Sequence, residues 1–373
     1  MNKIYITVFL VTFAIAGFFC GCCKNGNGDK NSGQYIVDMA GRKVWVPENA
    51  ERVVCKGPGT LRLITYLQAT DKVVGIEGGF EKQSVSGRPY RIAHEELTIL
   101  PTIGTAGPSP QADSEAVLRV KPDVVFISYA EGRILKNLQD RTKIPVVVLD
   151  PGPLGELDTN NVFQSLELAG KILGKSERAQ KVIDFIKSIE SELKQRVKNV
   201  AKRDRPSVYV GGLGYKGSQG ITSTQTDYPG FKLLDVHNVA GKLKQQGHIS
   251  VSKEKLLQWN PDVIFIDGGG LELVLTDCQK NPKFYKSLKA VENDQVYVLL
   301  PYNFYTTNIG TALANYSYMG KVLYGSAFED VNPAEKANTI YSFLVGAGVF
   351  EQMKKDYNGF KKLNLLETQH GKN

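Results

Sequence analysis

The stretch that decides the fold is Lys253–Ile266, KEKLLQWNPDVIFI, because it repeats an earlier stretch, Ser114–Ile127, SEAVLRVKPDVVFI. The two align without a gap and share a glutamate, a leucine, the triplet Pro-Asp-Val and the ending Phe-Ile. In each copy, apolar residues three and four apart predict a short helix. The proline ends that helix, because it disfavours helical geometry in the residue before it. The apolar run after the aspartate predicts a strand buried on both faces, as in a parallel sheet.

Each copy of the repeat is followed by further sheet elements. After the first copy we expect a helix near Gly132–Lys143 and a strand over Pro145–Leu149, and after the second a strand over Gln295–Leu300. Strands that alternate with helices indicate a parallel sheet. The alternative is that α/β proteins reuse such phrases by chance. Two ungapped copies, one in each half, instead predict an α/β fold of two equivalent Rossmann-like β/α lobes with a ligand cleft between them.

One long helical pattern separates the two copies. It opens at Ser176, a candidate N-cap, and its apolar stripe continues to Val200, which corresponds to roughly 37 Å of helix. A single helix of this length joins two lobes by one rigid crossing, so we expect limited relative motion. The predicted boundaries are 35–173 for the N-terminal lobe, 174–203 for the linking helix and 204–373 for the C-terminal lobe.

The first residues predict export. An apolar run, Ile4–Phe19, follows Lys3 and is short for a membrane span but typical of a secretory signal. It ends in four residues that resemble a lipobox, Cys20-Gly21-Cys22-Cys23. The small Gly21 favours Cys22 over Cys20 and Cys23 as the lipidated residue, and the alternative is an anchor that is never cleaved. We expect a signal peptide at 1–22, a flexible polar tether at 23–34 and an extracytoplasmic protein that is lipid-anchored to the cell membrane.

The composition is that of a globular protein, with 42% hydrophobic and 23% charged residues in a chain of 373. The formal net charge is +8, but Lys and Arg are dispersed along the chain. This pattern favours solubility and a mild attraction for anions over nucleic-acid binding. Beyond the leader, Cys55 and Cys278 are far apart and have no metal-ligand spacing. We expect two buried thiols, with a disulfide between them as the alternative.

These features in this order resemble the class III periplasmic binding proteins, the lipoprotein solute-binding components of ABC importers for iron-siderophores, haem and cobalamin. The resemblance covers the chain from about Tyr35 to Phe360. Val37–Val54, VDMAGRKVWVPENAERVV, is similar to the family's opening phrase. It predicts a hairpin that turns at residues 40–42, followed by a first sheet strand over Arg52–Cys55. Leu67–Gly79 and Leu100–Thr105 are similar to later phrases of the family.

The resemblance also implies partners, namely an ABC permease and its ATPase. Members of the family dock on permease arginines through one acidic residue of each lobe, at the start of the helix before each Pro-Asp strand. These residues map onto Glu115 and Glu254, at equivalent positions of the repeat. Two carboxylates held apart by a rigid body can each pair with an arginine fork. The alternative is that the helix macrodipole simply favours glutamate in a first turn. We expect a monomer.

Ligands of open parallel sheets bind beyond the carboxyl ends of the strands, so the loops there hold the candidate ligand-binding residues. Aromatic and cationic side chains predominate in them, which favours a large, planar or chelated anionic ligand. The candidates are Thr60, Arg88, Tyr90, Tyr129, Tyr215, Lys216, Tyr302 and Tyr305. For each tyrosine the alternative is surface packing. Binding of a bare metal ion is disfavoured because the four histidines are not clustered. Tyrosinate coordination of ferric iron by Tyr302 and Tyr305 stays open.

Catalysis is not expected. Gly212–Gly217 matches the G-x-G-x-x-G of dinucleotide-binding proteins, but no helical pattern follows it to hold a pyrophosphate. We interpret its glycines as a loop that brings Tyr215 and Lys216 to a ligand. The expected function is capture of a ferric siderophore-type complex, with no catalytic residue, resident metal or cofactor. The alternatives are cobalamin or another corrinoid, haem or a metal oxyanion as the ligand, and less favoured is a two-lobed cofactor-binding enzyme.

Overall fold

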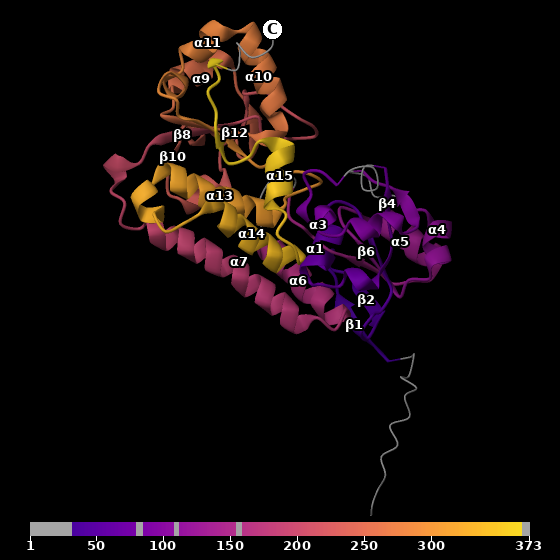
Figure 1. The fold of residues 1–373 in the computed structure, drawn as a ribbon. Helices are drawn as coiled ribbons and strands as arrows, with labels where there is room; N and C mark the ends of the chain where they lie inside the picture. Colours follow the sequence, from indigo (N-terminus) through magenta and orange to yellow (C-terminus); the bar gives the residue numbers. More distant parts are fainter. Residues whose placement is uncertain (1–31, 80–84, 108–111, 154–158, 368–373) are drawn as a thin grey trace, which may run out of the picture. The chain divides into compact units, whose positions relative to one another are not determined.

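Two five-stranded sheets organise the chain, one formed before and one after the long helix α7 (Ser176–Val197) (Figure 1). The computed structural model describes residues 32–79, 85–107, 112–153 and 159–367. The predicted signal peptide, Cys22 and all but the last residues of the predicted tether lie outside these ranges.

The first sheet is parallel and has the strand order β5-β4-β3-β6-β7, and we call the part built around it the N-lobe. The second sheet, of the C-lobe, has the order β10-β8-β12-β13-β14 and is parallel except for β14. This architecture confirms the predicted α/β fold of two β/α lobes. The strands are β3 (Val53–Lys56), β4 (Val73–Gly78), β5 (Thr102–Thr105), β6 (Val124–Ile127), β7 (Val146–Val148), β8 (Ser207–Gly211), β10 (His237–Asn238), β12 (Val263–Asp267), β13 (Val296–Leu299) and β14 (Lys361–Lys362).

Two antiparallel pairs and a set of helices complete the lobes. The first pair, β1 and β2, is the hairpin predicted near the start of the chain. The pairs are β1 (Gly33–Val37) with β2 (Lys43–Pro47) and β9 (Ser223–Gln225) with β11 (His248–Ser250). The other helices are α1 (Thr60–Tyr66), α3 (Pro89–Ile92), α4 (Ser114–Val120), α5 (Gly132–Thr142), α6 (Thr159–Ile172), α8 (Pro229–Leu233), α9 (Lys253–Trp259), α10 (Leu271–Lys280), α11 (Pro282–Lys286), α12 (Lys289–Glu292), α13 (Ile309–Leu323), α14 (Pro333–Val345) and α15 (Phe350–Tyr357).

The repeated stretches form the same helix and strand in both lobes, α4 with β6 and α9 with β12. Both helices end at a residue in the left-handed conformation, Lys121 with φ 46° and Asn260 with φ 42°. Each of these residues precedes the shared proline, which disfavours a further right-handed helical residue. The chain therefore leaves both helices in the same direction and enters equivalent central strands.

The aspartates after these prolines also have equivalent partners. Asp123 Oδ2 accepts a hydrogen bond of 2.8 Å from the backbone N–H of Arg52, and Asp262 Oδ2 accepts one of 2.8 Å from the backbone N–H of Ser207. Arg52 directly precedes Val53 of β3, the strand that pairs with β6. In the same way, Ser207 directly precedes Val208 of β8, the strand that pairs with β12. The repeat thus fixes the start of the adjacent strand in each lobe as well.

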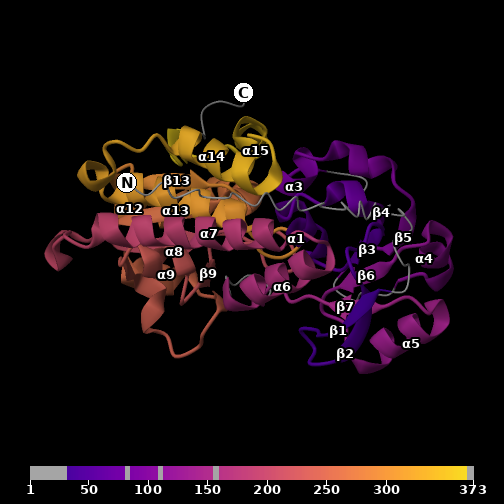
Figure 2. The ribbon, with the colours of Figure 1, turned by 90° about the horizontal axis from the view of Figure 1, so that it is seen from below.

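Helix α7 connects the lobes and packs on α6 of the N-lobe and on α8 and α13 of the C-lobe (Figure 2). Its 22 residues span roughly 33 Å. The N-cap is Lys175 and Ser176 is the first helical residue, so the assignment of Ser176 as N-cap is wrong by one position. Gly174, with φ 66°, turns the chain into the helix one residue earlier than expected. The helix ends at Val197, and Val200 packs against the core from the turn that follows.

One hydrophobic core runs through both lobes and includes residues of both sheets and of α7, among them Phe126, Phe265 and Ile186. Two smaller clusters lie on the other faces of the sheets, one beneath α4 and α5 and one beneath α9 to α12. Separating the lobes would expose part of the shared core, at a cost of about 25 cal/mol per Å² of apolar surface. A continuous core therefore favours small movements between the lobes.

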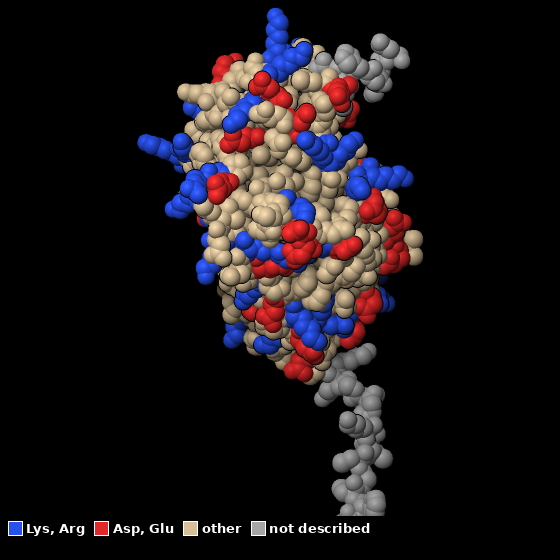
Figure 3. All heavy atoms as spheres, turned by 60° about the vertical axis from the view of Figure 1, so that its left-hand side comes forward, with Lys and Arg blue, Asp and Glu red and all other residues tan. Residues whose placement is uncertain are grey.

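The surface carries charges of both signs, and they are interspersed on the face shown in Figure 3. In the part of the chain that the structure describes, no helix combines the length and apolar character needed to cross a membrane. Cys55 on β3 and Cys278 on α10 are buried as thiols in two different hydrophobic clusters. This confirms the expectation of two buried thiols.

Candidate functional site

Loops from the two lobes contact one another at the carboxyl ends of the parallel strands. Tyr129, after β6, has its hydroxyl oxygen 3.2 Å from Thr306 Oγ1, in the loop after β13. The hydroxyl of Tyr305 donates a hydrogen bond of 2.6 Å to Glu77 Oε2 on β4. This is the edge at which the parallel sheets predict a ligand. The residues of these contacts and their direct partners form what we call the inter-lobe site, namely Lys56, Arg62, Glu77, Tyr129 and Phe304–Asn308.

A buried ion pair lies at the centre of the inter-lobe site. Lys56, the last residue of β3, is fully buried, and its Nζ is 2.5 Å from Glu77 Oε1 and 2.5 Å from the carbonyl oxygen of Thr105. On the other side of Glu77, the Tyr305 hydroxyl also accepts a hydrogen bond of 3.2 Å from the backbone N–H of Gly107. Burial raises the pKa of the Glu77 carboxyl, while Lys56 and Tyr305 act to lower it. Titratable groups in such surroundings are functional candidates.

Arg62 ties the C-lobe loop to the N-lobe. Its guanidinium group, on α1, donates hydrogen bonds to the backbone carbonyl oxygens of all four residues of Phe304–Thr307 and, at 3.0 Å, to Asn308 Oδ1. Tyr305 and Thr306 have φ values of 54° and 63°, so this loop is irregular and its carbonyl groups need partners outside a helix or sheet. The planar fork of an arginine suits several acceptors at once. Arg62 therefore sets the position of the Tyr305 backbone relative to the N-lobe.

Two glycines allow the loops to approach. Gly57 and Gly59, between β3 and α1, have φ values of 86° and 81°. A Cβ atom on Gly57 would lie 2.6 Å from Ser128 Oγ, and one on Gly59 would lie 2.7 Å from Thr306 Cγ2. Glycine is needed at both positions for the left-handed backbone, at Gly57 also for the close approach of Ser128 within the N-lobe, and at Gly59 for that of the C-lobe loop.

Two predicted ligand-binding residues of the N-lobe lie beside the ion pair. Thr60 is buried, and its hydroxyl donates a hydrogen bond of 2.9 Å to the carbonyl oxygen of Lys56. Tyr129 is half-buried, and its hydroxyl donates to the carbonyl oxygen of Gly152 and faces Thr306. The structure thus brings both residues to the inter-lobe site, with their hydroxyl groups already engaged by the protein.

The other two predicted N-lobe residues are also buried, and they lie beside Phe304 and Arg62. Arg88 is fully buried, and its guanidinium carbon is 5.4 Å from the centre of the Phe304 ring. Tyr90 is 1% exposed, and the Arg62 guanidinium lies over its ring at 5.2 Å. Both side chains therefore support the loop that carries Tyr305.

The structure separates the two predicted tyrosines that follow β13. Tyr305 belongs to the inter-lobe site. Tyr302 is 1% exposed, and its hydroxyl donates a hydrogen bond of 3.2 Å to Gln225 Oε1. Its ring packs edge-on against Tyr228, with 5.8 Å between the ring centres. Tyr302 thus lies inside the C-lobe, whereas Tyr305 reaches across to the N-lobe.

The glycine-rich loop after β8 carries the last two predicted residues. Tyr215 stacks on His248 with 4.2 Å between ring centres, and Lys216 is exposed with its Nζ 5.5 Å from the Tyr215 ring. His248 is also hydrogen-bonded to Ser223 Oγ at 2.8 Å, and burial lowers its pKa. After Gly217 the chain runs through a turn to β9 without forming a helix. This confirms that the match to a dinucleotide-binding motif is accidental.

Three charged residues lie at or near the ends of otherwise apolar strands at this edge, and we did not select them from the sequence. They are Lys56 in β3, Glu77 near the end of β4 and Asp267 in β12. Asp267 is 2% exposed and accepts a hydrogen bond of 2.8 Å from the backbone N–H of Gly269. Burial raises the pKa of Asp267 to about 7. A charge at the carboxyl end of a buried parallel strand is a signal that could have found all three.

The two predicted docking glutamates occupy equivalent places on the surface. Glu115 and Glu254 are exposed and are the second residues of α4 and α9. Each helix is capped by a side chain, from Asp113 and Ser252 respectively. The assignment of these glutamates to permease docking stays a prediction.

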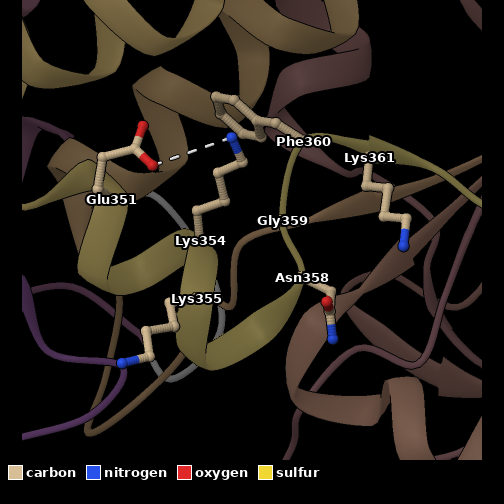
Figure 4. A pocket seen from close by; sticks show the side chains of 7 residues that line it. All are labelled: Glu351, Lys354, Lys355, Asn358, Gly359, Phe360 and Lys361. Atoms are coloured by element: carbon tan, nitrogen blue, oxygen red, sulfur yellow. Dashed lines mark ion pairs between the residues drawn. The ribbon is translucent and has the colours of Figure 1, made fainter.

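A separate surface pocket of about 340 Å³ lies between α15 and β14 (Figure 4). Its cationic side chains are exposed, and Lys354 forms an ion pair of 3.9 Å with Glu351. The lining residues are Glu351, Lys354, Lys355, Asn358, Gly359, Phe360 and Lys361. None of the predicted ligand-binding residues is among them, so we place the candidate site at the inter-lobe contacts.

The inter-lobe site offers buried positive charge and hydrogen-bond donors. Within residues 32–367, leaving out the three gaps, no group of three or more His, Cys, Asp or Glu is placed to hold a metal ion. Lys56 and Tyr305 present hydrogen-bond donors, and donors of these kinds suit the oxygen atoms of an anion.

Comparisons with known proteins agree with the two-lobed α/β fold. A family model described as "Periplasmic binding protein" matches residues 53–302. The chain is 27% identical over 327 residues to the molybdate-binding protein MolA of Haemophilus influenzae. The aligned region covers 82% of this chain and 89% of that protein. It is 29% identical over 311 residues to the iron-uptake system-binding protein of Bacillus subtilis, which covers 80% of this chain and 91% of that protein.

A solved structure shows the same fold. Molybdate-bound MolA of Haemophilus influenzae matches with a TM-score of 0.66 and 22% identity, over 84% of this chain and 98% of that chain.

Proposed function

The chain belongs to the periplasmic binding protein family, whose members are substrate-binding proteins of ABC importers, and we propose that its ligand is an anionic, oxygen-rich metal species bound at the inter-lobe site. We further propose that the protein is lipid-anchored through Cys22 and reaches the permease through Glu115 and Glu254. Ligand binding without turnover follows from this role, because the ligand is passed on unchanged.

The observation that carries the proposal is the set of buried cationic side chains around one loop. Lys56, Arg62 and Arg88 are 0%, 2% and 0% exposed, and all three border or contact the loop that holds Tyr305. Charges removed from water interact more strongly with an incoming anion than charges on the surface do. The loop is also the contact between the lobes, so a ligand here would touch both.

A ferric chelate of the siderophore type is the first candidate. Such chelates present several carboxylate, hydroxamate or catecholate oxygens to the protein, and these are the acceptors that ammonium, guanidinium and phenol groups bind. The similarity to the iron-uptake system-binding protein of Bacillus subtilis supports this choice.

A molybdate-type oxyanion is the second candidate. The Glu77 carboxylate contacts Lys56 at 2.5 Å and Tyr305 at 2.6 Å, so one small anion in place of that carboxylate would reach both donors. The similarity to the molybdate-binding protein of Haemophilus influenzae supports it. Haem and corrinoids are less favoured, because Tyr90 and Tyr302 are each 1% exposed and offer no open ring face to a macrocycle.

The proposal is tested by exposing the purified full-length protein to ferric citrate, a ferric hydroxamate, molybdate, cyanocobalamin and haemin, and recording native mass spectra. We expect a one-to-one complex with a ferric chelate or with molybdate, recovered chemically unchanged, and a weaker complex for Lys56→Met. Preferential binding of cyanocobalamin or haemin, or conversion of the bound compound into a product, would contradict the proposal.

A further inference from the structure

The ammonium group of Lys56 depends on its partners inside the protein. The residue is fully buried at the end of β3, and Thr60 holds its carbonyl oxygen with a hydrogen bond of 2.9 Å. Its Nζ contacts Glu77 Oε1 and the carbonyl oxygen of Thr105, each at 2.5 Å. A buried ammonium group is stable only with a counter-charge and hydrogen-bond acceptors, since it has lost its water. Glu77 provides that counter-charge.

The Glu77 carboxylate uses the same donors that we assign to the ligand. One oxygen accepts from Lys56 of the N-lobe, and the other accepts from the hydroxyl of Tyr305 of the C-lobe at 2.6 Å. The backbone N–H of Gly57 is a third donor. An oxyanion or a chelate carboxylate that approaches Lys56 and Tyr305 would therefore meet a carboxylate already seated there.

We propose that Glu77 is an intramolecular competitor of the ligand, which holds Lys56 and Tyr305 until an anionic oxygen of the ligand replaces its carboxylate. This inference rests on the proposed function and adds to it a specificity-determining residue. Because Glu77 satisfies Lys56 in the absence of a ligand, the protein avoids an uncompensated buried charge.

Because Glu77 competes for the same donors, an anion can occupy the site only if it binds Lys56 and Tyr305 more strongly than the Glu77 carboxylate does. A monovalent anion such as acetate offers Lys56 no more than Glu77 already provides, and it must also give up its own hydration. An anion with two charges, or with several oxygens in one rigid group, can bind Lys56 and Tyr305 together and gain more than the displaced carboxylate loses. Glu77 therefore selects against monovalent anions. A bound ligand would replace it as the group that contacts both Lys56 of the N-lobe and Tyr305 of the C-lobe.

A different role for Glu77 would have a different signature. If the carboxylate contacted the ligand directly as an acceptor, its removal would weaken binding. If the Lys56–Glu77 pair were only structural, its loss would change stability and leave the preference among anions as it is. The competitor role predicts that removing the carboxylate charge strengthens anion binding, and most strongly while Lys56 is present.

The test measures molybdate and ferric citrate affinity of the full-length protein by calorimetry in the wild type, Glu77→Gln, Lys56→Met and the double variant. We expect Glu77→Gln to bind the recognised anion at least about tenfold more tightly, the equivalent of about 1.4 kcal/mol. We also expect it to bind acetate and the wild type to reject acetate. In the Lys56→Met background, Glu77→Gln should have a smaller effect, because it then releases only Tyr305. Glu131→Gln, an exposed residue before α5, is the matched control and should bind as the wild type does.

Two further readouts keep the test decisive. Thermal unfolding reports whether Glu77→Gln is folded, and Glu77→Asp, which withdraws the carboxylate by one methylene, should give a smaller change in the same direction. Wild-type binding with an unchanged or weaker affinity in a folded Glu77→Gln protein overturns the competitor role and leaves the proposed function intact. If no anion binds either the wild type or Glu77→Gln, both proposals fall.

Discussion

The hydroxyl of Tyr305 donates a hydrogen bond of 2.6 Å to Glu77 Oε2 and so joins residues that are 228 positions apart in the chain. Arg62 fixes the backbone that carries Tyr305, and Lys56 fixes the carboxylate that accepts the hydrogen bond from its hydroxyl. The contact is therefore held from both sides by buried cationic side chains of the N-lobe. The same contact therefore connects the two lobes and forms part of the proposed ligand site.

We expect Arg62→Met to destabilise the protein by about 2–5 kcal/mol, because the carbonyl groups of Phe304–Thr307 lose a buried charged donor. Urea unfolding measures the change. Arg62→Lys should recover only part of the loss, since an ammonium group cannot reach all these acceptors. As a control, Arg133→Met on the exposed side of α5 should stay within about 0.5 kcal/mol of the wild type. A similar loss of stability in Arg62→Met and Arg133→Met would contradict the stabilising role of the Arg62 hydrogen bonds.

Charge reversal of the two glutamates proposed for docking, Glu115→Lys with Glu254→Lys, should abolish ligand uptake by cells while the purified protein keeps its ligand affinity. The reason is that each lysine would face a permease arginine instead of pairing with it. Uptake of labelled ligand and calorimetry are the two measurements. The control pair, Glu177→Lys with Glu292→Lys, changes the net charge equally at other exposed positions and should transport normally. Normal uptake in the first variant would refute the docking assignment.

The pH dependence of stability should contain a contribution from Asp267. Its pKa is raised to about 7 in the folded protein, so the folded state keeps a proton that the unfolded chain releases near pH 4. The stabilisation is complete below pH 4 and is lost as the pH rises to about 7, by at most about 1.4 kcal/mol per pH unit.

Asp267→Asn removes this titration and keeps an acceptor for the Gly269 N–H group. Relative to the variant, the wild type should lose stability between pH 4 and pH 7 and lose no more above pH 8. Urea unfolding of both proteins at several pH values measures the difference. Parallel stability profiles for the two proteins would show that Asp267 titrates normally.

Replacement of Cys22 by serine should stop lipid attachment and release the protein from the cell membrane. Metabolic labelling with a radioactive fatty acid and fractionation of membranes measure the two effects. Cys20→Ser and Cys23→Ser are the matched controls and should be labelled normally. Labelling that survives Cys22→Ser but not one of the controls would move the lipidation site to that cysteine.

Because of the internal repeat, most of the fold could be predicted from the sequence. Helix and strand periodicity are local, so the elements α4, β6, α9 and β12 follow from the residues that form them. The breakers after Gly217 likewise showed that no helix follows the glycine-rich loop. The exact start of α7 was harder, because Gly174 turns the chain two residues before the candidate cap Ser176 and makes Lys175 the N-cap.

The candidate site divides in the same way. By itself the sequence determined the two β/α lobes, the edge at which their loops lie and the equivalence of Glu115 and Glu254, because these depend on patterns within short stretches. Only the tertiary structure decided that Tyr302 turns into the C-lobe while Tyr305 reaches Glu77. The direction and burial of a side chain depend on which distant segments pack around it. A buried charge such as Lys56 acquires its role from a partner that no local pattern specifies.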